Sequence, residues 1–294
     1  MAAGVLSPVK RVNSMPYQCP LCHSTLRLDG RQWSCANNHR FDCAKEGYVN
    51  LMPVQFKHSR QPGDSSAMMQ ARSAFLQAGH YQPLRDAVQA ALARYLPAPG
   101  CNVLDIGCGE GYYTASWCEA AQAQVYGLDI AKVAIRYAAR HYPAVRFCVA
   151  SSQRLPFADA SMGGVVRIYA PCNAAELARV VADGGCLVTV TPAARHLYQL
   201  KELVYPQVHL HEQKEELLAG FTPVASQRLA YEMNLSGAQA ADLLQMTPFA
   251  WRAAPGVSEA LRARSALMCE TDFLIRVYRR DAAPVDQARA DTRA

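Results

Sequence analysis

One stretch decides the fold of this chain: Val103-Leu104-Asp105-Ile106-Gly107-Cys108-Gly109-Glu110-Gly111. Aliphatic residues around a single acid are typical of a buried strand, and the glycines after it let the backbone turn tightly and approach a ligand closely. A strand, a glycine-rich turn and a helix open many doubly wound α/β folds, which bind ligands at the carboxyl ends of their strands. The stretch therefore predicts a ligand-binding turn after the first strand of such a sheet.

Strands and helices alternate beyond this turn. The predicted strands are residues 102–106, 124–129, 145–150, 164–169 and 186–191, with helices at 132–140 and 174–181 between them. Two helices are predicted before the turn, at 67–77 (with Ser65 as a cap) and 83–96, and two antiparallel strands after it, at 223–233 and 271–279. This alternation favours an α/β protein with a mostly parallel sheet and helices on both faces.

The side chains around the turn favour a cationic ligand. Asp105 stands just before the turn, where it meets the cationic amino-acid portion of a ligand, and Glu110 would repel a phosphate. Asp129 ends the second predicted strand, where a carboxylate can accept both hydroxyls of a ribose. We therefore expect S-adenosylmethionine here, with Gly107 and Gly109 close to it.

The chain has eleven cysteines, and three of them near the N-terminus, together with one histidine, have metal-ligand spacing. Cys19 and Cys22 are separated by two residues, and Cys35 and His39 follow as a second pair. Two thiolates on one knuckle and a second pair on another turn form a closed tetrahedral site, which is typical of structural zinc. Cys43 is the alternative to His39. Zinc binding would supply the folding energy that this segment, poor in apolar residues, lacks.

The net charge of +6 is concentrated near the N-terminus. The first 60 residues hold eight lysines and arginines against three acids, which is expected of a lobe that binds a polyanion, or of a solubilising surface. Within this lobe, Lys57, His58 and Arg60 are expected either to contact RNA phosphate or to lie on a solvated surface. No apolar run is long enough to span a membrane and no secretory signal is recognisable, so we expect no membrane association and a cytoplasmic protein.

Further stretches carry a family resemblance. Residues 151–159 (Ser-Ser-Gln-Arg-Leu-Pro-Phe-Ala-Asp) and 183–185 (Asp-Gly-Gly) resemble segments of the class I (Rossmann-like) methyltransferases, which implies a mostly parallel seven-stranded sheet. More specific matches lie at residues 41–51, 62–65, 69–72, 75–84, 167–172, 195–197 and 244–252. Together with the cysteine spacing, these resemble the RlmA family of 23S rRNA (guanine-N1)-methyltransferases over roughly residues 17–280. The segment 167–172 is most similar to the Gram-negative type.

The resemblance carries several implications. A member of this family transfers a methyl group to N1 of a guanine in a hairpin loop of 23S rRNA, uses its zinc module to help grip the hairpin, and pairs as a homodimer. Tyr81, the turn at Gly109 and Glu110, and His196 would contact the methyl donor. The implied organisation is a flexible leader (1–16), a zinc-binding module (17–43), a connecting segment and helix (44–80), the methyltransferase domain (81–280) and a disordered tail (281–294).

The chemistry of the acceptor site is less determined. Arg167 and Tyr169 lie at the end of the fourth predicted strand, where Arg167 can favour the deprotonated guanine and Tyr169 can stack on the base. No catalytic base is identifiable, and Trp251 is expected to pack in the core. Two alternative activities stay open: a pyrimidine-C5 RNA methyltransferase with Cys172 as nucleophile, and a small-molecule methyltransferase. A non-enzymatic nucleic-acid-binding module is the third reading.

Overall fold

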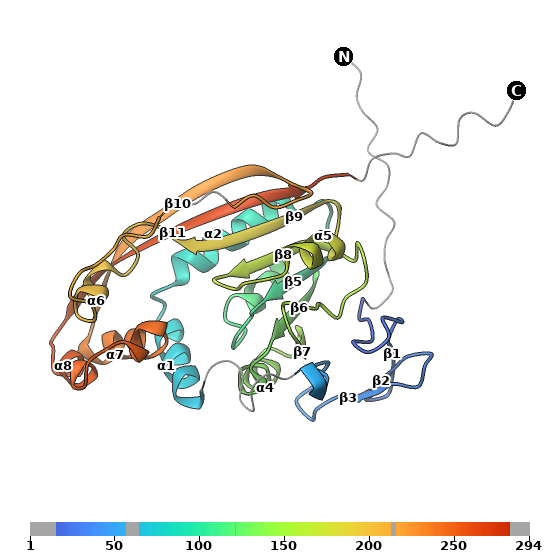
Figure 1. Cartoon of the computed structure of the whole chain (residues 1–294), viewed down its shortest axis with the longest axis horizontal. Helices are drawn as coiled ribbons and strands as arrows, with labels where there is room; N and C mark the ends of the chain where they lie inside the picture. Colours follow the sequence, from blue (N-terminus) through green and yellow to red (C-terminus); the bar gives the residue numbers. More distant parts are fainter. Residues whose placement is uncertain (1–15, 57–64, 121, 213–215, 283–294) are drawn as a thin grey trace, which may run out of the picture.

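A twisted sheet of eight strands forms the body of the protein (Figure 1). The computed structural model describes residues 16–56, 65–120, 122–212 and 216–282. The strand order is β10-β11-β9-β8-β5-β6-β7-β4, with parallel pairing from β4 to β9 and antiparallel pairing of β11 with β9 and with β10. The strands are β4 (Val49–Asn50), β5 (Asn102–Ile106), β6 (Gln124–Asp129), β7 (Arg146–Val149), β8 (Met162–Ile168), β9 (Val181–Pro192), β10 (Phe221–Leu235) and β11 (Leu267–Arg280). The predicted α/β class is confirmed.

The sheet has one strand more than the seven predicted. The extra strand, β4, comes from the connecting segment and pairs in parallel with β7 through Val49 and Cys148. Leu51 continues the contact, because its backbone N–H donates to the Val149 carbonyl at 2.9 Å. A two-residue strand carries too little periodicity to be recognised in a sequence.

The helices lie on both faces of the sheet, as predicted. They are α1 (Ser66–Gln77), α2 (Gln82–Tyr95), α3 (Trp117–Ala120), α4 (Lys132–His141), α5 (Ala174–Val180), α6 (Tyr198–Glu202), α7 (Gly237–Gln245) and α8 (Val257–Arg262), with 3₁₀ turns η1 (Val54–Phe56), η2 (Thr114–Ser116) and η3 (Pro248–Trp251). The expected cap is present, because the Ser65 side chain accepts from the Met68 N–H. Helices α2 and α4 pack on the face that bears Val103 and Val166, whereas α5 packs on the face that bears Leu104 and Val165.

A small three-stranded sheet, the N-terminal ribbon, covers part of the second face. Its strands are β1 (Arg27–Asp29), β2 (Gln32–Ser34) and β3 (Arg40–Asp42). Tyr17 joins it to the body, because the Tyr17 ring meets Trp33 of the ribbon edge-on at 5.0 Å and Tyr126 of β6 at 5.6 Å. The ribbon lies at the opposite end of the molecule from α6, α7 and α8 (Figure 1). The expected module therefore shares a core with the sheet that it covers.

The C-terminal strands are longer than predicted and form a long antiparallel pair, with α7, η3 and α8 between them in the chain. β10 and β11 pair from Phe221↔Arg280 to Leu235↔Leu267, with one irregularity at Pro223. β10 is the edge strand, and proline is tolerated at edges and bulges because it donates no ladder hydrogen bond. Most side chains of β10 are exposed, so the strand has no clear alternation of apolar and polar residues that would mark its ends in the sequence.

Several predictions concern residues that the structure does not describe, and one prediction is wrong. The leader up to residue 15, the tail from 283 onward, and Lys57, His58 and Arg60 lie outside the described residues. Trp251 was expected in the core, and this is wrong, because its side chain is 77% exposed at the end of η3. Within the described chain, no helix is long and apolar enough to cross a membrane.

Candidate active site and metal centre

The glycine turn after β5 is held by backbone contacts. The N–H groups of Gly107 and Cys108 both donate to the Leu128 carbonyl, at 2.8 and 3.0 Å, which ties the turn to β6. Gly107 has a φ of 73°, a conformation that L side chains rarely adopt. A Cβ atom at Gly107 would lie 2.7 Å from the Cβ of Ala170. The turn therefore requires glycine here, both for its conformation and for its close packing.

A cavity of about 590 Å³, the turn cavity, opens above these glycines. Its walls include Gly107, Gly109, Asp105 and Glu110 from the turn region, and Arg72 from α1. The volume is in the range of about 300–1,000 Å³ that is usual for small-molecule sites. The turn cavity is therefore large enough for a nucleoside with an amino-acid chain.

Two buried acids line the turn cavity. Asp105 is 2% exposed, and the Thr114 hydroxyl donates to its Oδ2 at 2.6 Å. Glu110 is 1% exposed, and both of its carboxylate oxygens lack a hydrogen-bond partner among the described residues. Burial raises the pKa of each acid to about 7, against the opposing effects of Thr114 on Asp105 and of Arg72 on Glu110. A cation that enters the turn cavity would pair with these groups and stabilise their ionised forms.

Arg72 is a residue of this site that the sequence analysis did not single out. Its Nη2 donates to the Met246 carbonyl at 3.2 Å, which links α1 to the chain after α7. It also lies 3.8 Å from the position that a Cβ at Gly109 would take. A buried acid and a guanidinium on the same cavity are complementary to the ammonium and carboxylate of an amino acid. The residues present therefore fit the amino-acid end of S-adenosylmethionine.

Tyr81 and His196 line the turn cavity, and their contact with the methyl donor stays a prediction, whereas Asp129 lies behind the turn. The Asp129 carboxylate accepts the backbone N–H groups of Gly109 at 3.0 Å and of Ala131 at 2.7 Å. It thus shapes the turn, and it does not line the turn cavity in this arrangement. The proposed contact of Asp129 with a ribose stays a prediction.

His196 is held as a neutral imidazole. Its Nδ1 accepts the backbone N–H of Asp272 at 3.2 Å, so its Nε2 carries the proton and faces the Tyr169 hydroxyl at 3.3 Å. Burial, reinforced by the charge of Lys201, lowers the pKa of His196 to about 3. His196 therefore positions Tyr169 and remains uncharged at neutral pH.

A second cavity of about 480 Å³, the sheet cavity, adjoins the first. Both are lined by the same four residues, Tyr169, Ala170, Pro192 and His211. Arg167 lines the sheet cavity, so the structure places both of the predicted acceptor-site candidates on it. Tyr169 has a φ of 55°, and such conformations of non-glycine residues cluster at functional sites. β8 ends at Ile168, one residue earlier than predicted. The backbone changes direction at Tyr169, whose side chain therefore lines both cavities.

Cys172 is poorly placed for a nucleophile. It lines neither cavity, and its Sγ donates to the Ser152 carbonyl at 3.1 Å. Burial raises the pKa of Cys172 to about 12, so the reactive thiolate is scarce at neutral pH. The geometry argues against the pyrimidine-C5 alternative.

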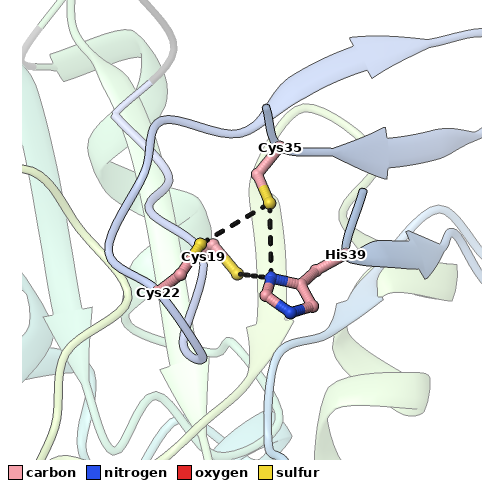
Figure 2. Close-up of side chains that lie close together, drawn as sticks. All are labelled: Cys19, Cys22, Cys35 and His39. Carbon is pink, nitrogen blue, oxygen red and sulfur yellow. Dashed lines mark hydrogen bonds between the residues drawn. The ribbon is translucent and has the colours of Figure 1, made fainter. Parts of the chain in front are cut away.

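The four predicted metal ligands converge from two loops (Figure 2). His39 Nδ1 lies 3.5 Å from the Sγ atoms of both Cys19 and Cys35, and the Sγ atoms of Cys22 and Cys35 are 3.6 Å apart. A tetrahedral zinc with Zn–S bonds of about 2.3 Å and Zn–N bonds of about 2.0–2.1 Å separates its ligand atoms by about 3.5–3.8 Å. The donor set and its spacing therefore fit structural zinc. Cys43 is not part of this cluster.

Fold, turn cavity and metal cluster together define a class of protein: an S-adenosylmethionine-dependent methyltransferase with an N-terminal zinc ribbon. The chain matches the zinc-ribbon family model described as "RlmA, N-terminal" over residues 17–60, and the model described as "Methyltransferase domain" over residues 103–185. The chain belongs to the RlmA family of 23S rRNA (guanine-N1)-methyltransferases, as the following relatives demonstrate.

Three curated relatives span most of the chain. The "23S rRNA (guanine(748)-N(1))-methyltransferase" of Streptomyces fradiae is 35% identical over 83% of this chain and 89% of its own length. The "Putative 23S rRNA (guanine-N(1)-)-methyltransferase" of Micromonospora griseorubida is 33% identical over 86% of this chain and 92% of its own. A similarly named Bacillus subtilis protein, YxjB, is 29% identical over 83% and 90%. The family prediction is confirmed, and the Gram-negative subtype stays a prediction.

Proposed function

We propose that the protein methylates N1 of a guanine in a hairpin loop of 23S rRNA, with the methyl donor in the turn cavity and the guanine in the sheet cavity. The observation that carries this arrangement is the contact between the two cavities, which share Tyr169 and His211. Methyl transfer needs the nucleophile in line with the methyl group, and two adjoining sites provide this geometry. S-adenosylmethionine supplies an electrophilic methyl group on a sulfonium.

The residues of the turn cavity have separate tasks in this proposal. Glu110 binds the donor's ammonium group and Arg72 its carboxylate, while Asp105, held by Thr114, adds negative charge beside the turn. The glycines at 107 and 109 allow the backbone to approach the donor, and Tyr81 and His196 close the wall. In this proposal the side chain of Asp129 rotates so that one carboxylate oxygen accepts from the ribose, while the other keeps its hydrogen bond with the backbone of the turn.

Tyr169 is proposed to stack on the target base. Its side chain is 44% exposed, stands between the two cavities and is aligned by His196. Stacking on an aromatic ring is the usual way to hold an unpaired base. The zinc ribbon then grips the hairpin through exposed arginines such as Arg27 and Arg40. Because its proposed substrate is rRNA, we expect the enzyme in the cytoplasm. The family resemblance favours a homodimer, and the mass of the protein in solution, measured by light scattering, tests this.

The test is primer extension on 23S rRNA from a strain that lacks the enzyme. After incubation with the purified protein and donor, we expect a stop at one loop guanine, because an N1-methyl group blocks Watson–Crick pairing. The no-donor reaction is the control. A stop at guanine 748 would match the name of the Streptomyces relative, a stop at another loop guanine would support the predicted Gram-negative subtype, and absence of any stop would refute the function.

A further inference from the structure

The floor of the sheet cavity is a polar row across three strands. Arg167 of β8 pairs in register with Thr189 of β9, which pairs with Arg276 of β11, and all three line the sheet cavity. The preceding residues on the same face, Val165 and Leu187, belong to the apolar core. A row of polar side chains therefore interrupts an otherwise apolar face of the sheet at one place.

Two polar atoms in this row are buried without a partner. Thr189 is 2% exposed and Arg167 is 9% exposed, and neither Thr189 Oγ1 nor Arg167 Nε has a hydrogen-bond partner within the described part of the chain. An unsatisfied buried polar group destabilises the fold, so such atoms usually mark a ligand or a function. The sheet cavity is therefore a built polar site.

Glu216 places a carboxylate next to this floor. It forms an ion pair with Arg167, and its side chain remains 34% exposed. The Tyr278 hydroxyl donates to the Glu216 backbone carbonyl at 3.3 Å, which anchors this part of the chain to β11. A carboxylate can accept the N1–H of guanine, and a guanidinium beside it can donate to the adjacent O6. The pair therefore matches this edge of guanine. Adenine presents the reverse order, an acceptor at N1 beside an amino donor.

Asp105 and Glu110 of the turn cavity are assigned to the methyl donor, and the other titratable groups around the two cavities are less suited than Glu216 to accept a proton. His211 Nε2 lies 2.7 Å from Lys201 Nζ, and burial together with that ammonium lowers the pKa of His211. His196 carries its proton on Nε2, as described above. Although Tyr169 is partly exposed, desolvation raises the pKa of its hydroxyl well above the usual value, so this group is a neutral phenol. Arg276 is a cation, and Glu212 lines the sheet cavity from an exposed position.

We infer that Glu216 is the catalytic base for guanine N1 and, with Arg167, the group that selects guanine over adenine; this inference rests on the proposed function. The N1–H bond breaks and its proton passes to a Glu216 carboxylate oxygen. The freed N1 electron pair forms the N–CH₃ bond, and the electron pair of the broken C–S bond stays on sulfur as a neutral thioether. Arg167 donates to O6, where negative charge develops as N1 loses its proton. Glu216 then releases the proton to solvent from its exposed side.

The test is a pH profile of single-turnover methylation by the full-length, zinc-loaded protein on 23S rRNA. Glu216→Gln keeps the size of the side chain and cannot take the proton. We expect its rate at pH 7 to fall about 10²–10³-fold. Its rate should then rise about tenfold per pH unit towards pH 9, since hydroxide replaces the missing base. The wild type should reach a plateau at lower pH.

Matched variants make the outcome decisive. Glu216→Asp should restore part of the rate and the plateau, and Glu259→Gln, an exposed acid on α8 outside both cavities, should behave as the wild type. Donor affinity, measured by calorimetry, should stay within about twofold in every variant and shows that each is folded. A wild-type rate and profile for Glu216→Gln, or the same loss in Glu212→Gln, would overturn the inference. The wild-type stop on the same rRNA reports separately on the proposed function.

Discussion

The zinc ribbon and the glycine turn are both formed by short motifs, and they are stabilised in different ways. The ribbon has three strands of three residues, and Trp33 is the only residue of these strands that is buried. Outside its strands, Tyr17 and Leu26 join the core of the sheet, but the ribbon has little core of its own, so we expect the metal to contribute much of the energy that orders it. The turn needs no ligand to form, because β5 and β6 on either side of it are buried and hydrogen-bonded.

The comparison shows where each site is vulnerable. Loss of a ligand atom in the ribbon removes the source of its folding energy. A side chain added in the turn leaves the sheet intact and obstructs the space that the ligand needs. The ribbon should therefore fail by unfolding, and the turn by loss of affinity.

The largest effect is expected for Cys19→Ser. Metal binding contributes about 10–16 kcal/mol in isolated zinc modules, so loss of one thiolate should release the zinc and unfold the ribbon. Zinc content measures the release of the metal, and tryptophan fluorescence, to which Trp33 contributes together with Trp117 and Trp251, follows the unfolding. Cys43→Ser is the matched control, since Cys43 lies in the same ribbon outside the cluster and should keep the metal. Zinc loss in Cys43→Ser alone would show that the ligand set is wrong.

The turn is tested by Gly107→Ala. The added Cβ meets Ala170 and adopts a strained φ, so we expect donor affinity to fall about 100-fold while the fold is retained. Calorimetric titration measures the affinity and circular dichroism the fold. Gly100→Ala provides the comparison, because Gly100 has a φ of 77° and no atom within 4 Å of its added Cβ. It should lose about 1 kcal/mol of stability and no affinity. Equal affinities in the two variants would contradict the steric account.

The buried acids predict a pH effect on the donor-free protein. The pKa of Glu110 is raised from 4.5 to about 7, so its contribution to stability is fully present below pH 4.5 and is lost as the pH rises through 7. Between pH 5.5 and 8.5 the wild type should therefore lose about 2 kcal/mol more than Glu110→Gln. Urea unfolding at both pH values measures the difference. A parallel pH dependence in the two proteins would mean that Glu110 is already ionised, and Glu259→Gln controls for general charge effects.

The smallest effect is expected for donor affinity after zinc removal. The turn is fixed by Leu128 and Ala170, neither of which lies in the ribbon, so chelation should change the donor Kd by less than about threefold. RNA affinity, measured by filter binding, should fall much more. A donor Kd that weakens more than tenfold would show that the shared core around Tyr17 couples the two regions, and would remove the distinction between them.

Particular residues show how far the sequence predicted the site. The spacing of the four metal ligands and the position of Asp105 and Glu110 follow from local sequence, because each group is formed by one knuckle or one turn. Arg72 and Glu216 were missed, since they reach the cavities from segments far from the motifs, without a local pattern. The prediction that Trp251 lies in the core was wrong, because the burial of a tryptophan depends on the residues that surround it in the fold. The local sequence does not show which residues these are. Asp129 was found at the predicted strand end, with its oxygens on the backbone of the turn.

The sequence by itself determined the order of the strands and helices, the glycine turn and the zinc ligands, because hydrophobic period, glycine conformation and ligand spacing act over a few residues. The tertiary structure alone decided that the ribbon covers one face of the sheet, that a two-residue strand extends its edge, and that Arg167, Thr189 and Glu216 meet in one cavity. These arrangements depend on register and packing between segments far apart in the chain, and no local interaction encodes them.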